Sequence, residues 1–268
     1  MKNNLISKAL IIIFSIQLEA GTVNKSSADP REYNTFLLKN GMEVITVSDP
    51  ELATSAATLS VGVGAFQDPK EAQGAAHFLE HMIFMGSKKY KSPNEYMEFI
   101  SQNGGSTNAF TAAEQTTYLF SINSKQFAPA LDRLSSAIKE PLFDGTMVEK
   151  EINAVNSEWL KNRQTDTFIQ QRALALTGNP SHPRVKLGVG NKETLGTNEE
   201  QLLSSLRDFH SKFYSANLMK LVLVGNQSSK ELAKLARKYF SKIDNKKVER
   251  PVTNIPAYRA EDLSKEIF

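Results

Sequence analysis

The stretch GAAHFLEHMIF, residues 74–84, holds two of the four histidines of this 268-residue chain, His77 and His81, with Glu80 between them. On an α-helix, positions i, i+3 and i+4 lie on one face, so these three side chains point the same way. Two imidazoles one turn apart can both reach a single metal ion about 2 Å from each ring. The stretch is therefore predicted to be a helix that carries part of a metal site.

The order of the three residues, H-x-x-E-H, reverses the better-known H-E-x-x-H motif of zinc peptidases. Glu80 would lie beside the ion, a placement that suits a general base. Zinc lowers the pKa of a bound water toward about 7, and the carboxylate takes its proton as the water attacks a carbonyl. The alternative is an ordinary buried helix, since apolar residues flank the histidines. Unpartnered polar groups are costly to bury, however, and a metal ion would satisfy all three.

A second helix is predicted to supply a third ligand, because catalytic zinc usually has three from the protein. In VEKEINAVNSEWL, residues 148–160, Glu151 and Glu158 are two helical turns apart and share a face. Apolar neighbours place that face near the buried side, whereas Glu149 points away and is expected in solvent. The alternative is that Glu151 and Glu158 are also solvated.

The composition narrows the classes of function. The absence of cysteine excludes disulfides and thiolate metal sites, and the remaining histidine and carboxylate ligands favour zinc. The formal net charge is only +3, without a long basic block, so we expect no nucleic-acid partner. The 40% hydrophobic and 23% charged residues are typical of soluble globular domains.

The N-terminus, residues 1–28, has the pattern of a secretory signal peptide. Two lysines accompany an apolar run over residues 9–18, and small residues follow, so that cleavage is expected after Ala20 or Ala28. A run of this length is too short to cross a bilayer, which takes about 20 residues. We therefore expect a periplasmic or secreted protein without a stable membrane anchor.

Strand and helix signals alternate along the rest of the chain. Strands are predicted in a hairpin over 33–49 with an Asn40-Gly41 turn, at 55–66, twice within 106–123, and at 217–226. Helices are predicted at 73–85, 92–104, 124–138, 146–176, 197–214 and 228–243, three of them opened by capping boxes at 92–95, 197–200 and 228–231. Grouped strands with paired helices indicate an α+β fold, a mostly antiparallel sheet packed with helices. We expect one domain over residues 29–250, followed by an extended tail or linker over 251–268.

Four segments together, HFLEHMIFMGSKKY, NGGSTNAFTAAEQTTYLF, NAVNSE and GNPSHP, closely resemble the inverted-motif zinc metallopeptidases of the insulin-degrading enzyme and pitrilysin family. The resemblance runs from about Tyr33 to Asp262. It implies that His77, His81 and Glu158 bind one Zn²⁺ per chain and that Glu80 is the catalytic base. It also implies that Glu151 supports the metal ligands without binding the ion itself.

The same resemblance implies a peptide-binding edge strand in STNAFT, residues 106–111. Backbone groups of Asn108, Ala109 and Phe110 would pair with a peptide substrate that adds as a further strand. The alternative is that the segment is an inner strand of the sheet.

By this resemblance, a family member has two facing halves, each of two related domains, that enclose a chamber. This chain ends near the close of the first such domain. We therefore expect a zinc-dependent metalloendopeptidase domain that is weak without a facing half, which a second chain could supply.

Two other functions stay open. A non-catalytic interaction subunit of the same fold would not need His77, Glu80, His81 and Glu158 together. A serine hydrolase would have Ser101, Ser106 or Ser157 available, but no G-x-S-x-G motif is present. The other two histidines, His182 and His210, are expected to be structural.

Overall fold

The computed structural model describes residues 23–196 and 198–262. Most of the predicted signal peptide lies outside these residues, as does Thr197, the first residue of the second predicted capping box. Within the described ranges, no helix combines the length and apolar character needed to cross a membrane.

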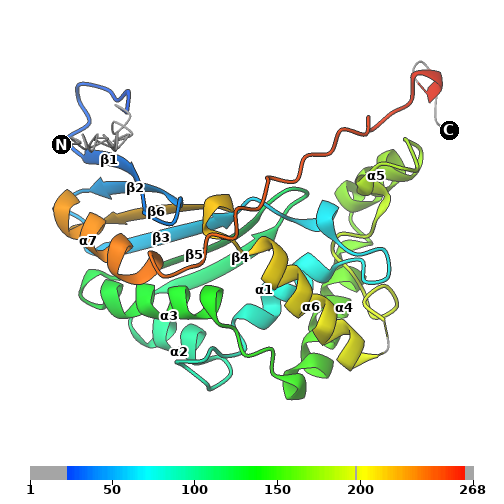
Figure 1. The fold of residues 1–268 in the computed structure, drawn as a ribbon, viewed down its shortest axis with the longest axis horizontal. Coiled ribbons are helices and arrows are strands. Elements are labelled where there is room, and N and C mark those ends of the chain that lie inside the picture. The colour runs from blue at the N-terminus through cyan, green and yellow to red at the C-terminus, as the bar shows by residue number, and fades with distance from the viewer. Residues whose placement is uncertain (1–22, 197, 263–268) are drawn as a thin grey trace, which may run out of the picture.

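One six-stranded sheet forms the first layer of the fold, with strand order β1-β2-β6-β3-β5-β4 (Figure 1). The strands are β1 Glu32–Leu37, β2 Glu43–Ser48, β3 Thr54–Val61, β4 Ser106–Thr111, β5 Thr116–Asn123 and β6 Met219–Gly225. Neighbouring strands pair antiparallel except β2 and β6, which pair parallel. The predicted α+β class with a mostly antiparallel sheet is confirmed.

Most of the helices lie on one face of the sheet, whereas α5, Asp166–Leu176, lies to one side and contacts the short turn Pro183–Val185 (Figure 1). The helices are α1 Ala75–Ile83, α2 Glu95–Gln102, α3 Phe127–Lys139, α4 Val148–Asn162, α5 Asp166–Leu176, α6 Glu199–Phe213 and α7 Ser229–Phe240, and short 3₁₀ turns lie between them. Strand β3 shows why one face is covered, because Ala57, Leu59 and Val61 are buried while Thr58 and Ser60 between them are half-buried. This alternation is the period of a strand with one apolar face.

The first hairpin turns where the sequence predicts. Gly41 has a φ of 82°, a left-handed conformation that glycine adopts without a steric penalty. The Asn40 side chain donates hydrogen bonds to the carbonyl oxygens of Phe240 (2.9 Å) and Ile243 (2.8 Å). The turn is thereby tied to the end of α7.

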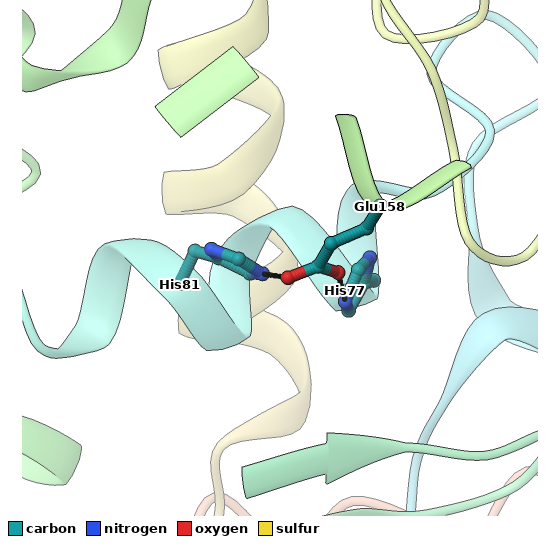
Figure 2. Close-up of side chains that lie close together, drawn as sticks. All are labelled: His77, His81 and Glu158. Carbon is teal, nitrogen blue, oxygen red and sulfur yellow. Dashed lines mark ion pairs between the residues drawn. The ribbon is translucent and has the colours of Figure 1, made fainter. Parts of the chain in front are cut away.

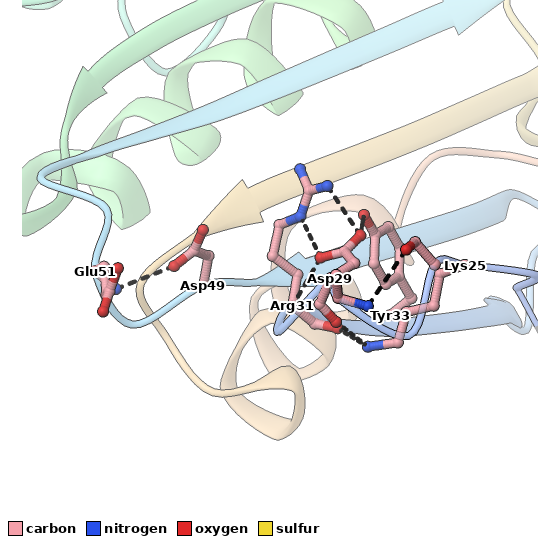
Figure 3. Close-up of polar contacts among 8 residues, drawn as sticks. Lys25, Asp29, Arg31, Tyr33, Asp49 and Glu51 are labelled. Carbon is pink, nitrogen blue, oxygen red and sulfur yellow. Dashed lines mark hydrogen bonds and ion pairs between the residues drawn. The ribbon is translucent and has the colours of Figure 1, made fainter.

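A small polar cluster anchors the segment before β1 (Figure 3). The guanidinium of Arg31 donates to the carboxylate of Asp29, with Nε at 2.8 Å from Oδ1, and the Tyr33 hydroxyl donates to Oδ2 of the same carboxylate at 2.9 Å. The Lys25 ammonium donates to the backbone oxygens of Asp29 and Arg31. Most of these contacts are exposed, so they orient the segment more than they stabilise the fold.

The predicted single helix over 146–176 is wrong, because the chain forms α4 and α5 with a break between them. Thr165 adopts an extended conformation, and its hydroxyl accepts a hydrogen bond from the backbone N–H of Phe168 at 3.4 Å. Threonine before an aspartate is a common start signal for a helix. The signal lies in an all-polar run, KNRQTDT over residues 161–167, through which the predicted helix extends.

The predicted capping box at 92–95 is also wrong. Asn94 is the residue before α2, in a left-handed conformation with a φ of 65° and no side-chain cap. The Glu95 carboxylate instead pairs with Arg133 of α3, with 2.8 Å between Nη2 and Oε1. The box that opens α7, between Ser228 and Glu231, is formed as predicted.

Candidate metal centre

Helix α1 is held in the interior with one polar face left open to a cavity. Phe78, Leu79, Met82 and Ile83 are fully buried on its packed side, where α1 contacts α4, α6 and β4. The helix begins after Gly74, and the Asp68 carboxylate accepts hydrogen bonds from the backbone N–H groups of Gly74 and Ala76, each at 2.8 Å. An acceptor at a helix N-terminus satisfies donors that have no partner within the helix.

The side chains of His77, His81 and Glu158 converge between α1 and α4 (Figure 2). The Glu158 carboxylate lies across the two rings, with Oε2 at 3.4 Å from His77 Nε2 and Oε1 at 3.8 Å from His81 Nε2. One ligand atom from each residue lies within 4.8 Å of those from the other two. Two imidazoles and one carboxylate at this spacing are a donor set for a divalent metal such as zinc.

The outer nitrogen of each ring has its own partner. Nδ1 of His77 lies 2.8 Å from the carbonyl oxygen of Val189, and Nδ1 of His81 lies 3.1 Å from Oε2 of Glu151, which is buried. Because a carbonyl only accepts, Nδ1 of His77 carries the hydrogen and the lone pair is on Nε2. The geometry thus fits a metal ion, since both Nε2 atoms face the Glu158 carboxylate.

Glu80 lies on the same face of α1 and is only 7% exposed. The Thr111 hydroxyl, at the end of β4, donates a hydrogen bond of 2.6 Å to its Oε2. Burial raises the pKa of Glu80, and this hydrogen bond opposes the rise in part. A carboxylate with a raised pKa is better suited to accept and return a proton near neutral pH.

The two histidines have opposite pKa shifts. Burial and the neighbouring His81 lower the pKa of His77. Burial also acts to lower the pKa of His81, but the hydrogen bond with Glu151 and the negative charges of Glu158 and Glu80 outweigh it and raise the pKa. His77 is therefore held in the neutral form that a metal ligand requires.

All of the predicted site residues line one cavity of about 430 Å³. These are His77, Glu80, His81, Glu151 and Glu158 from the helices and Asn108, Ala109 and Phe110 from β4. Strand β4 forms one edge of the sheet, beside β5. Asn108 and Phe110 are exposed on it, and Ala109 is half-buried. The cavity thus joins the converging side chains to an open strand edge.

Sequence reasoning missed Thr111 and Val189. Thr111 shares a face of β4 with Ala109, because strand side chains alternate, so its approach to the helix could have been inferred from the strand period. Val189 contributes only a backbone carbonyl, which any residue would supply, so no sequence pattern marks it.

The remaining histidines lie away from this group. His182 is buried, and its Nδ1 accepts from the backbone N–H of Arg184 at 3.1 Å. His210 of α6 lies with Nε2 at 2.8 Å from the carbonyl oxygen of Ile138. Burial lowers the pKa of His210 to about 4.

We expect His210 to make the fold sensitive to acid. Its pKa is lower in the folded than in the unfolded chain, so the unfolded chain binds the extra proton as the pH falls from about 6.5 to 4, and stability is lost over that window. The loss from this group is about 3 kcal/mol at most. His210→Gln should be less stable at pH 7 but change less between pH 7 and pH 4.5, as measured by urea unfolding without metal. An equal pH dependence in both proteins would contradict this assignment.

Comparison with known proteins matches this chain to one peptidase family. The family Insulinase (Peptidase family M16) matches residues 43–181, and its companion, the Peptidase M16 inactive domain, matches residues 202–267. The human insulin-degrading enzyme is 42% identical over 233 residues, which are 85% of this chain and 23% of that enzyme. Protease 3 of Escherichia coli K12 is 41% identical over 261 residues, 93% of this chain and 27% of that protein.

Solved structures agree with the sequence comparison. Pitrilysin superposes with a TM-score of 0.87 at 41% identity, over 90% of this chain and 26% of that one. A protease from Helicobacter pylori, at 20% identity, shares the fold with a TM-score of 0.72. The chain spans about a quarter of the length of the human enzyme, Protease 3 and pitrilysin. By sequence and by fold, it belongs to the insulinase family of peptidases, family M16.

Proposed function

We propose that this chain is the zinc-binding domain of a metalloendopeptidase that hydrolyses peptide bonds. The convergence of His77, His81 and Glu158 beside Glu80, in a cavity that an edge strand borders, carries the proposal. Membership of a peptidase family supports it.

Each residue has a role in this proposal. His77, His81 and Glu158 would hold one Zn²⁺, whose Lewis acidity lowers the pKa of a water molecule and polarises the substrate carbonyl. Glu80 accepts a proton from the attacking water and returns it to the leaving amine. The hydroxyl of Thr111 holds one carboxylate oxygen of Glu80, whose side chain lines the cavity.

The substrate would be a peptide in extended form. Among the described residues 23–196 and 198–262, β4 pairs with β5 alone, which leaves one row of its backbone groups unpaired within the sheet. A peptide that adds there through Asn108, Ala109 and Phe110 would run past the metal ligands, because both line one cavity.

The proposal includes a partner, a facing half of the peptidase, because the relatives are about four times longer than the region that matches this chain. A second polypeptide segment would close the cavity and add substrate contacts, and we expect weak cleavage without it. The alternative is a non-catalytic or partner-dependent interaction subunit or fragment of the same fold. The serine alternative has less support, since the hydroxyls of Ser106 and Ser157 bond to Ser121 and to the backbone oxygen of Asn153.

Zinc titration with a cleavage assay tests the proposal. Chelator-treated protein, residues 29–268, should take up one zinc per chain and then cleave a quenched fluorescent peptide in proportion to bound zinc. A chain that takes up no zinc would refute the proposal. One bound zinc with cleavage no faster than the chelated blank would favour the partner-dependent alternative.

Glu151→Gln should weaken zinc binding by about tenfold. Glutamine keeps the size and one acceptor oxygen but loses the charge that holds the His81 ring, 3.1 Å away. Competition with a chromophoric chelator would measure the change. Glu149→Gln, at an exposed position on the same helix, is the matched control and should bind zinc as the wild type does.

We propose that the protein is exported and is periplasmic or secreted, which the signal-peptide pattern of residues 1–28 supports. Mass spectrometry of the protein recovered from cell fractions would test it, with a new N-terminus after Ala20 or Ala28 as the expected result.

A further inference from the structure

The loop over residues 187–194 is fastened at both ends to Gln73, which lies two residues before the first residue of α1. The Gln73 side-chain oxygen accepts from the backbone N–H of Leu187 at 2.8 Å, and its backbone oxygen accepts from the Thr194 hydroxyl at 2.9 Å. Both contacts join segments more than a hundred positions apart in the sequence. The loop therefore closes over the N-terminal end of the helix that carries His77.

Asn191 makes the same loop rigid from within. It is 4% exposed, and its side-chain oxygen accepts from the backbone N–H groups of Glu193 (2.9 Å) and Thr194 (2.8 Å). Its own backbone N–H donates to the Thr194 hydroxyl at 3.0 Å. A buried side-chain oxygen that accepts from two backbone N–H groups favours one loop conformation.

Two glycines bring the loop and the helix into backbone contact. A Cβ placed on Gly74 would lie 2.3 Å from Cα of Gly190, and a Cβ on Gly190 would lie 3.0 Å from Cα of Gly74. Both residues have positive φ, 95° and 72°. A side chain at either position would separate the two backbones.

The loop that contains Gly190 bonds to His77 of α1 and also to helix α4. The Val189 carbonyl oxygen, next to Gly190, reaches His77 Nδ1 at 2.8 Å. The backbone N–H of Lys192 donates to the Asn156 side chain of α4 at 3.2 Å, two residues before Glu158. The loop thus touches both elements that supply the converging groups.

We propose that the 187–194 loop is a positioning element of the metal site, and that the Gly74–Gly190 contact sets its affinity for metal. The loop holds His77 with its hydrogen on Nδ1 and its lone pair on Nε2, and it fixes α1 against α4 before any ion binds. This inference rests on the proposed zinc function and adds a determinant that lies outside the ligand set.

Gly190→Ala tests the contact, with Gly196→Ala as its matched control. Both replace a glycine of positive φ, 72° and 84°, so both strain the backbone alike. Only the first meets neighbouring atoms, because a Cβ on Gly196 has nothing within 4 Å. Gly190→Ala should weaken zinc binding by about 10- to 100-fold, as loss of an outer partner does elsewhere, and Gly196→Ala by less than about twofold.

A second readout needs no metal. Long-range ¹H–¹⁵N spectra of the metal-free protein report which ring nitrogen of His77 carries the hydrogen, and the four histidines allow assignment by single substitution. The wild type and Gly196→Ala should show Nδ1–H, whereas Gly190→Ala should show a mixture of tautomers. A loop with only a structural role would not move this signal.

The outcomes separate this inference from the proposed function. A wild type without zinc affinity overturns both. Tight binding by the wild type together with unchanged affinity and tautomer in Gly190→Ala overturns the loop inference alone. If Gly190→Ala does not fold, Thr194→Val decides the question, because it removes the hydroxyl bond to Gln73 without adding bulk. Unchanged zinc affinity and tautomer in that variant would again overturn the inference.

Discussion

Glu80→Gln is expected to lower kcat for peptide cleavage by about a thousandfold while zinc remains bound. Glutamine has nearly the same shape as glutamate, and its amide oxygen can still accept the hydrogen bond from Thr111. The variant therefore keeps the local structure but cannot take a proton from water. The loss should appear in kcat with little change in KM, because Glu80 is not assigned a role in binding the peptide.

Initial rates with a quenched fluorescent peptide would measure this effect, with zinc content determined in the same samples. The chelated wild type is the blank, and Glu149→Gln, exposed on α4, is the control that should keep wild-type activity. Glu80→Gln that cleaves as fast as the zinc-loaded wild type would show that another group is the base. Zinc loss in the variant would instead place Glu80 among the ligands.

Glu158→Ala is expected to weaken zinc binding by more than about a hundredfold, beyond the effect of an outer partner such as Glu151. It removes one of three converging ligands and leaves two. The Glu158 side chain is 47% exposed, so its removal leaves the hydrophobic core intact. A loss of affinity would therefore report the lost ligand and not a damaged fold.

Thermal unfolding with and without zinc provides the measurement. An ion that binds only the folded chain stabilises it by about 2.7 kcal/mol at a concentration one hundred times the Kd. Zinc should therefore raise the Tm of the wild type and of Glu149→Ala but leave that of Glu158→Ala unchanged. Equal shifts in all three proteins would mean that zinc binds elsewhere.

The sequence predicts the local elements of this protein better than their junctions. The helix around His77 and the hairpin at Asn40-Gly41 follow from periodicity and turn chemistry, which act within a few residues. The break before α5 was missed although residues 161–167, KNRQTDT, are all polar and include the Thr165-Asp166 start signal. The capping box at 92–95 failed because Glu95 has a stronger partner in Arg133, which comes from a distant part of the chain.

The residues of the candidate site likewise fall into those that local spacing predicts and those that depend on distant parts of the chain. His77, Glu80 and His81 are set by one helix, so their common face follows from spacing alone. The approach of Glu158 depends on how α4 packs against α1, and the sequence shows only that Glu151 and Glu158 share a face. The position of the Val189 carbonyl depends on a loop conformation that glycines permit. Every residue has a backbone oxygen, so the amino-acid type at position 189 does not predict this contact.

The position of β6 has a consequence for the order in which the molecule assembles. It is the last strand in the described residues, yet it lies between β2 and β3, so that Val44 pairs with Leu221 and Leu59 with the same residue. The early strands β2 and β3 therefore lack this neighbour until β6 has been made, and such long-range pairing makes folding slow. Helix α1 also packs against α6, which comes later in the sequence, so its packing is incomplete until α6 has been made. We expect newly made chains to acquire metal affinity only after β6 and α6 are in place, and to need protection from aggregation until then.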